Sequence, residues 1–247
     1  MDRDALNRRD ALALAGAATA AATAVVGLTG SAALAQSARI TPTATDALIV
    51  VDVQNDFLPG GSLAVPRGDE VIAPINALCE RFTHVVVTQD WHPKGHMSFA
   101  SSHPGKAPFE VITVSYGNQV LWPDHCIQGT RGSALSDALK VDKAELIIRK
   151  GYNPAIDSYS AFVEADRNTK TGLASYLRER GIRRVFVTGL ATDFCVGWTA
   201  IDARQAEFET ILIEDACRGI DTGGSMARAL AGMQTAGVVR MTSADIA

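Results

Sequence analysis

The sequence predicts an α/β protein with a parallel sheet that is covered by helices on both faces. From residue 46 onward, short apolar runs alternate with longer segments of helical composition. The runs are continuously apolar, which is typical of strands buried on both faces. Strict alternation of strand and helix favours parallel strands joined by helical crossovers. The 247 residues are 47% hydrophobic and 20% charged, as in an ordinary globular protein.

The expected elements follow in order along the chain. The strands are short, rich in Val, Ile and Leu, and are expected at 48–53, 84–88, 145–148, 184–187, 210–213 and 238–241. Between them, helical patterns predict helices at 69–82, 133–139, 171–180, 193–205 and 224–236. The first crossover passes through a loop containing Pro59-Gly60-Gly61. The segment 90–132 is too long for a simple connection, which usually marks function, and it holds four of the five histidines.

The first 35 residues are predicted to be a twin-arginine-type signal peptide. Arg8-Arg9 precedes an Ala-rich apolar stretch over 11–28, and Ala33-Leu34-Ala35 fits the small-x-small pattern of a cleavage site. The export machinery is therefore an expected partner, and the mature protein is expected in the periplasm. Asn7 and Ala11 depart from the usual twin-arginine pattern, which leaves the general secretory route open.

A polar linker over 36–45 and a single domain over 46–247 are expected to follow the signal peptide. Thr and Gly interrupt the apolar stretch of the leader, so it would be a weak membrane span. We expect no stable membrane insertion after cleavage, with an uncleaved anchor as the alternative.

Composition excludes several classes of protein. The net charge is −4 and aromatic residues make up 6% of the chain, so nothing suggests a nucleic-acid partner. Four scattered cysteines suit neither a disulfide scaffold nor a CxxC zinc site. Neither HExxH nor GxGxxG occurs, which removes support for zincin and dinucleotide-binding interpretations. The oligomeric state is not indicated.

Chemically complementary residues stand at the ends of four predicted strands. They are Asp52, Asp90, Lys150 and Cys195. Because reacting groups of an open α/β sheet gather beyond the carboxyl ends of its strands, all four are expected to face one crevice. Cys195 falls in the first turn of the helix expected at 193–205, where unpaired N–H groups would favour a thiolate, with Asp193 as the expected N-cap.

The long connection supplies a second set of functional side chains. Asp90 and His92 are two residues apart on one side of an extended segment. Together with His125 they form a carboxylate and two-imidazole set suited to one divalent metal ion, zinc, iron or manganese. His96 is spaced so that it could be a fourth ligand, whereas His84 and His103 are expected to be structural.

These residues lie in stretches that resemble the nicotinamidase/pyrazinamidase branch of the isochorismatase-like cysteine hydrolases. The matching stretches are VDVQNDF at 51–57, QDWHP at 89–93, WPDHC at 122–126, KG at 150–151, DSYSAF at 157–162 and GLATDFC at 189–195. They occur in the family's order from about residue 46 to the C-terminus. The resemblance implies a three-layer α/β/α sandwich with a six-stranded parallel sheet, the isochorismatase-like hydrolase fold.

The resemblance also implies roles for individual residues. It makes Asp52, Lys150 and Cys195 a catalytic triad and assigns the metal to Asp90, His92 and His125. It implies a cis peptide between Leu190 and Ala191, with the N–H groups of Ala191 and Cys195 forming an oxyanion hole. Such a metal is expected to hold the pyridine nitrogen, with the substrate ring bound by Phe57, Trp122 and Tyr159.

The activity implied is hydrolysis of nicotinamide to nicotinate and ammonia through a thioester on Cys195, in pyridine nucleotide salvage, with pyrazinamide as a second substrate. One alternative is another member of the superfamily, such as an isochorismatase or an N-carbamoyl amidohydrolase. The Asp-x-His…His set and the nucleophilic Cys together argue against those. A non-catalytic binding protein for a metal or an aromatic ligand is the alternative from another class, and a reactive thiol argues against it.

Overall fold

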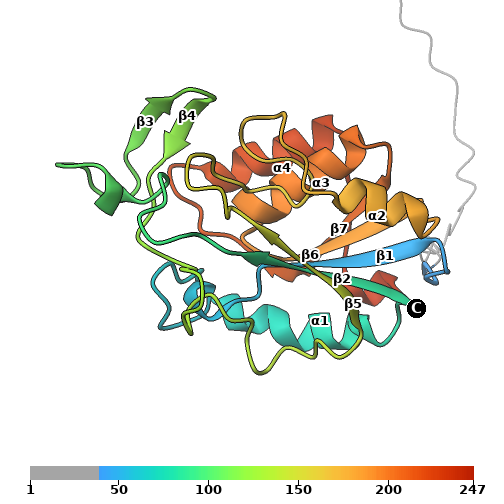
Figure 1. Ribbon diagram of the computed structural model, residues 1–247. Helices are drawn as coiled ribbons and strands as arrows, with labels where there is room; N and C mark the ends of the chain where they lie inside the picture. Colours follow the sequence, from blue (N-terminus) through green and yellow to red (C-terminus); the bar gives the residue numbers. More distant parts are fainter. Residues whose placement is uncertain (1–38) are drawn as a thin grey trace, which may run out of the picture. The chain divides into compact units, whose positions relative to one another are not determined.

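The computed structural model describes residues 39–247 and contains a parallel six-stranded sheet in the order β5-β2-β1-β6-β7-β8 (Figure 1). The sheet strands are β1 (Asp46–Val51), β2 (His84–Asp90), β5 (Ala144–Lys150), β6 (Arg184–Leu190), β7 (Glu209–Arg218) and β8 (Val239–Met241). Every predicted strand is present. The predicted parallel sheet with helices on both faces is confirmed.

Helices cover the sheet unequally. Helix α1 (Ile72–Cys79) lies on one face, and helices α2 (Leu173–Glu179), α3 (Gly197–Gln205) and α4 (Ser225–Thr235) lie on the other (Figure 1). The alternation of side chains along β1 explains the two cores. Leu48 and Val50 belong to the cluster that includes residues of α1, whereas Ile49 belongs to the cluster that includes residues of α2, α3 and α4.

Three expected helices differ from the structure. The helix expected at 133–139 is wrong: the segment forms turns, and the Ser133 and Ser136 side chains bond to nearby backbone groups, which competes with helix formation. The helix expected at 69–82 is a 3₁₀ turn (Gly68–Val71) followed by α1. The helix expected at 193–205 opens with a π-turn (Thr192–Val196), and α3 begins only at Gly197.

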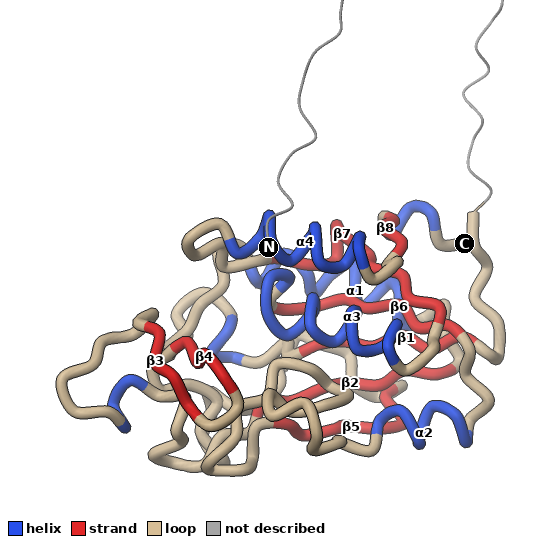
Figure 2. Tube along the Cα trace, turned by 90° about the horizontal axis from the view of Figure 1, so that it is seen from above, coloured by secondary structure: helices blue, strands red, loops and turns tan. Residues whose placement is uncertain are grey.

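A two-stranded antiparallel hairpin was not predicted within the long connection. It consists of β3 (Val111–Val114) and β4 (Gly117–Val120). Figures 1 and 2 both show this hairpin standing apart from the main sheet. Its strands are four residues each, too short for a clear periodic signal, although Gly117 with φ of 123° marks the turn.

The strand order reverses between β1 and β6. The chain runs from β1 to β2 and β5 on one side, and from β6 to β7 and β8 on the other. A ligand-binding crevice is expected beyond the carboxyl ends of the strands at such a point. Asp52 follows β1, Asp90 and Lys150 end β2 and β5, and Cys195 follows β6.

The predicted signal peptide lies outside the described residues, as does the start of the predicted linker. Within that linker, Ile40 pairs with Ile246 near the C-terminus. Within residues 39–247, no helix is long and apolar enough to cross a membrane.

Candidate active site

The four strand-end residues converge in one buried cluster. The ammonium group of Lys150 lies 2.8 Å from Asp52 Oδ2, 2.8 Å from Asp90 Oδ1 and 3.3 Å from Cys195 Sγ. A carboxylate oxygen of Asp52, one of Asp90 and the sulfur of Cys195 all lie within 4.8 Å of one another. The predicted acid, cation and nucleophile therefore meet, although they come from positions far apart in the sequence.

Lys150 is the centre of this cluster. Its side chain is fully buried, and its Nζ also donates to the Ser158 carbonyl at 3.1 Å. Burial alone would lower the pKa of Lys150, but the charges of Asp52 and Asp90 outweigh it and hold the pKa well above its usual value. The lysine is therefore a permanent cation, and it can balance negative charge on either carboxylate or on the thiol.

Asp52 is held in a left-handed backbone conformation, with φ of 48°, immediately after β1. Thr88 fixes it from the neighbouring strand, because its hydroxyl donates to Asp52 Oδ1 at 2.5 Å and accepts from the Asp52 N–H at 3.1 Å. Within residues 39–247, Asp52 Oδ2 has no hydrogen bond of good geometry despite its short distance to Lys150. This oxygen can therefore accept a proton.

Burial dominates the acid–base properties of the Asp52 and Cys195 pair. It raises the pKa of Asp52 against the opposing charge of Lys150. It also raises the pKa of Cys195 well above its usual value, against the opposing charge of Lys150, and the charges of Asp52 and Asp90 act in the same direction as burial. The thiolate expected from a helix N-terminus is therefore not the resting form, because Cys195 lies in a buried π-turn before α3.

Asp193 is not the N-cap that the sequence suggested. Ala191 occupies the cap position, without a side-chain cap. The carboxylate of Asp193 instead accepts from the backbone N–H groups of Ile220 and Asp221 at 3.0 and 2.8 Å, and from the Ser225 hydroxyl at 2.5 Å. Asp193 thus ties the cysteine turn to the start of α4.

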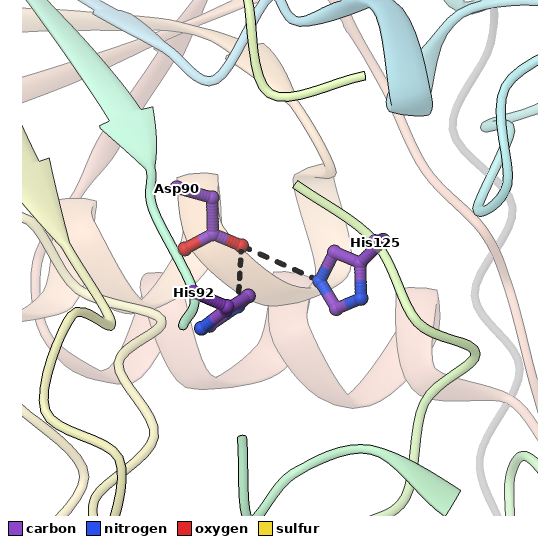
Figure 3. A group of neighbouring side chains, drawn as sticks. All are labelled: Asp90, His92 and His125. Atoms are coloured by element: carbon purple, nitrogen blue, oxygen red, sulfur yellow. Dashed lines mark hydrogen bonds and ion pairs between the residues drawn. The ribbon is translucent and has the colours of Figure 1, made fainter. Parts of the chain in front are cut away.

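Asp90, His92 and His125 form a three-residue group beside the Lys150 cluster (Figure 3). The Nε2 atoms of His92 and His125 lie 3.2 and 3.5 Å from Asp90 Oδ2. Each imidazole places Nδ1 2.8 Å from a backbone carbonyl, Gly151 for His92 and Pro123 for His125. A carbonyl only accepts, so both Nδ1 atoms carry hydrogen, and both Nε2 atoms face the Asp90 carboxylate. This donor set fits a divalent metal ion.

The backbone at Gly151 helps to hold His92 in place. Gly151 has φ of 66°, and a Cβ at this position would lie 2.5 Å from His92 Cε1. The residue directly after Lys150 must therefore be glycine for the imidazole to fit beneath the backbone.

His96 does not join the group. Its Nε2 lies 2.8 Å from the Asn153 carbonyl and 3.3 Å from that of Ile156, so Nε2 carries hydrogen. Its Nδ1 accepts from the Ser98 N–H at 3.3 Å and lies 2.7 Å from the Ser98 hydroxyl. With both nitrogens occupied, His96 supports the neighbouring His92 ring by stacking, with ring centroids 4.3 Å apart.

The two histidines expected to be structural also have local partners. His84 Nδ1 lies 3.0 Å from Glu145 Oε1, and His103 Nε2 lies 2.7 Å from the Met97 carbonyl. Neither lines the pocket that contains Cys195.

A small pocket opens onto the thiol and the Asp90 group. All three aromatic residues expected to bind the substrate ring line it, namely Phe57, Trp122 and Tyr159. The Phe57 ring centroid lies 5.5 Å from that of His125, and Trp122 Nε1 donates to Tyr159 Oη at 3.0 Å. The pocket therefore combines aromatic walls with the Cys195 thiol and with the candidate metal ligands Asp90, His92 and His125.

Further wall residues were missed from the sequence. They are Leu63, Asp157, Phe194 and Ile220. Ala191, which was predicted only for its N–H group, also lines the pocket. Phe194 stands beside Cys195 in the sequence, and Asp157 lies in the stretch before Tyr159, so proximity to those residues was the available signal. Leu63 and Ile220 carry no such signal, because only the folding of their loops brings them to the pocket.

The peptide bond between Leu190 and Ala191 is cis, as expected. The preceding residue, Gly189, has φ of 111°, and a Cβ there would overlap the Val51 backbone. β1 and β6 can thus approach closely where their ends carry Asp52 and the cysteine turn. Ala191, Phe194 and Cys195 from this turn line the pocket.

Comparisons with known proteins agree with this geometry. Residues 46–245 match the family model described as the isochorismatase domain. The chain is 57% identical over 200 residues to a nicotinamidase of Acinetobacter baylyi, covering 81% of this chain and 94% of that protein. A solved nicotinamidase/pyrazinamidase of Acinetobacter baumanii has a TM-score of 0.82 and 58% identity, covering 82% of this chain and 98% of that one.

A more distant solved structure bears on the metal. It is a pyrazinamidase of Pyrococcus horikoshii in complex with zinc, with a TM-score of 0.65 and 36% identity, covering 80% of this chain and 99% of that one.

Proposed function

We propose that this protein hydrolyses nicotinamide through a thioester on Cys195. The chain belongs to the isochorismatase family and is a nicotinamidase within it. The observation that carries the proposal is the contact of one buried ammonium group, that of Lys150, with Asp52, Asp90 and Cys195. A candidate proton acceptor and a fixed cation thus lie beside the Cys195 thiol, which lines an aromatic pocket.

In the first half of the reaction, Asp52 takes the proton from the Cys195 thiol as the sulfur attacks the carboxamide carbon. The carbonyl electrons move to oxygen, where the N–H groups of Ala191 and Cys195 would stabilise the negative charge. When the C–N bond breaks, Asp52 returns its proton to the leaving nitrogen, so ammonia departs and a thioester remains. The raised pKa of Asp52 favours acceptance of the proton by this carboxylate, and the charge of Lys150, which lowers the pKa of Cys195 against the effect of burial, favours its release from the thiol.

In the second half, water attacks the thioester and Asp52 accepts one of its protons. The C–S bond then breaks, the proton returns from Asp52 to sulfur, and the acid product releases its remaining proton to water and leaves as nicotinate. Lys150 stays charged throughout and compensates the charge on the carboxylates and the sulfur. Phe57, Trp122 and Tyr159 bind the ring and hold the amide in line with the thiol.

We propose that Asp90, His92 and His125 hold one divalent metal ion, zinc, iron or manganese. When bound, such an ion would supply a positive centre for the pyridine nitrogen, a template role. The hydrogen bonds from the two Nδ1 atoms keep the donor atoms oriented toward that position. Pyrazinamide also has ring nitrogens and an aromatic carboxamide, so it is proposed as a second substrate.

Ammonia release tests the activity. Purified protein should release ammonia from nicotinamide, and treatment with a chelator should reduce the rate until a divalent metal is returned. Rapid-quench mass spectrometry of Asp52→Asn and of the wild type should detect a nicotinoyl adduct on the Cys195 peptide in the wild type alone. Turnover that leaves sulfur unmodified under every condition would rule out the thioester.

We also propose that the protein is exported to the periplasm and serves pyridine nucleotide salvage. The support for export is the Arg8-Arg9 pair, the apolar stretch and the Ala33-Leu34-Ala35 site. N-terminal sequencing of protein from fractionated cells should find a mature chain that begins at Gln36. Recovery of the full-length chain from the cytoplasm alone would contradict this assignment.

A further inference from the structure

The polar side chain of Gln119 is buried on a hairpin whose other residues are largely exposed. Gln119 is 2% exposed, whereas its neighbours Gly117 and Asn118 in β4 are exposed. Burying an amide is costly unless its hydrogen bonds are replaced. The hairpin lies outside the main sheet (Figures 1 and 2). The hydrogen-bond partners of Gln119 therefore show which part of the protein holds the hairpin in place.

Those partners form a closed ring of hydrogen bonds. Gln119 Nε2 donates to Asp157 Oδ2 at 2.6 Å, and the Asp157 N–H donates to Tyr116 Oη at 3.1 Å. The Tyr116 hydroxyl lies 3.0 Å from Gln119 Oε1, to which it can donate. A carboxylate only accepts hydrogen bonds, so the contact with Asp157 fixes which end of the amide is Nε2.

Two members of this network line the substrate pocket. Asp157 is a wall residue, and so is Tyr159, whose hydroxyl lies 3.5 Å from Gln119 Nε2 and accepts from Trp122 at 3.0 Å. Asp157 is 2% exposed and has no ion pair among residues 39–247, so hydrogen bonds from Gln119 and from the Ser158 N–H at 2.8 Å compensate its buried oxygens.

We propose that Gln119 is a positioning residue for the substrate pocket, acting through Asp157 and Tyr159. Its amide fixes a buried carboxylate and contacts an aromatic hydroxyl on the same wall, so the hairpin determines how that wall meets the substrate. Trp122, two residues after β4, is a third wall residue attached to the same hairpin. The inference rests on the proposed function, because its effect is on binding of the aromatic amide.

Gln119→Met is the main test, since Met has about the same length but cannot donate or accept an amide hydrogen bond. We expect the KM for nicotinamide to rise about tenfold or more while kcat stays within about threefold, because ring placement is lost and the thiol cluster is untouched. Asn118→Met, on the exposed side of the same strand, is the matched control and should keep both constants.

Tyr116→Phe is a second variant, which removes the two hydrogen bonds of the Tyr116 hydroxyl in the ring but leaves the one between Gln119 and Asp157. It should raise KM in the same direction but less. The double variant should be no worse than Gln119→Met alone, because both changes break one network. Thermal denaturation of each variant gives the purely structural effect for comparison.

The outcomes separate the two proposals. A wild type that releases no ammonia from nicotinamide overturns the proposed function and this inference with it. An active wild type with an unchanged KM in Gln119→Met, whatever its melting temperature, overturns the positioning role alone. A lower kcat together with a lower melting temperature, at constant KM, would likewise assign Gln119 a structural role only.

Discussion

Asp90 and Lys150 are paired neighbours on parallel strands β2 and β5, and Asp90 Oδ1 lies 2.8 Å from Lys150 Nζ. The other oxygen of Asp90 faces His92 and His125. Lys150 also contacts Asp52 and Cys195. One carboxylate and one ammonium group therefore join the candidate thiol chemistry to the candidate metal site, and a change in either should be measurable in both.

Lys150→Met should abolish nicotinamide turnover and destabilise the fold. The substitution leaves two buried carboxylates without their cation, which typically costs roughly 3–5 kcal/mol. A divalent metal at Asp90 would offset part of that charge, so added zinc should raise the melting temperature more for the variant than for the wild type. Thermal denaturation with and without zinc measures this, and a stable, active variant would contradict the cluster's role.

Cys195→Ala should lower turnover by about a thousandfold or more, because the thiol is the proposed nucleophile. Melting temperature and metal content should stay close to wild type. Cys79→Ala is the matched control, since Cys79 is also a buried free thiol but ends α1, away from the pocket. Steady-state ammonia release compares the two, and comparable activity in both variants would exclude thiol catalysis.

His92→Ala and His125→Ala should each lower metal occupancy and raise the KM for nicotinamide. His103→Ala, which changes a histidine outside the pocket, should do neither. Elemental analysis and steady-state kinetics give the two readouts. Benzamide lacks the ring nitrogen and should be a poor substrate for the wild type, so efficient benzamide hydrolysis would count against the template role of the metal.

Gly151→Ala should impair the metal site without changing any of its donor atoms. The new Cβ would lie 2.5 Å from His92 Cε1, and φ of 66° is unfavourable for alanine. We expect lower zinc affinity than in the wild type, by about tenfold, as when a group that orients a metal ligand is lost. Calorimetric titration with zinc would detect this. Gly129 also has a positive φ, of 76°, but a Cβ there would have no atom within 4 Å. Gly129→Ala is therefore the control for backbone strain alone.

Glu164 should make the protein less stable as pH rises. Burial, followed by the charges of Asp166 and Asp157, raises the pKa of Glu164 from 4.5 to about 7, and its Oε2 lacks a hydrogen bond within residues 39–247. The folded state holds this proton more tightly, so the free energy of unfolding falls as pH rises from 4.5 to about 7. In Glu164→Gln, the decrease in the free energy of unfolding over this pH range should be smaller by on the order of 1–2 kcal/mol. Urea unfolding of both proteins at about pH 5 and about pH 8 tests this, and parallel pH profiles would refute it.

The sequence predicted the sheet well because its strands are buried on both faces. Continuous apolar runs such as 48–51 and 185–187 have few other structural uses, and the polar residues that end them stand out. That pattern is enough to predict that Asp52, Asp90, Lys150 and Cys195 meet at one edge of the sheet. Their catalytic and metal-binding roles remain predictions.

The remaining features depend on contacts that no local pattern encodes. Ser133 and Ser136 bond to their own turn, which replaced an expected helix. His96 Nε2 has its hydrogen-bond partners in the carbonyls of Asn153 and Ile156, more than fifty residues away. The thiol pKa follows from burial in the folded protein, whereas the helix-terminus argument considered only the adjacent residues.

The position of β1 at the centre of the sheet has a consequence for synthesis. β1 pairs with β6, and the Asp46–Arg184 ion pair joins residues 138 apart in the chain. At typical rates of translation, β6 leaves the ribosome about 7–28 s after β1. During that interval the apolar edge of β1 lacks its partner, and Cys195, which follows β6, has not left the ribosome. A nascent or truncated chain that ends before residue 184 therefore has an exposed strand edge for chaperones to bind, but no assembled site for a reactive thiol.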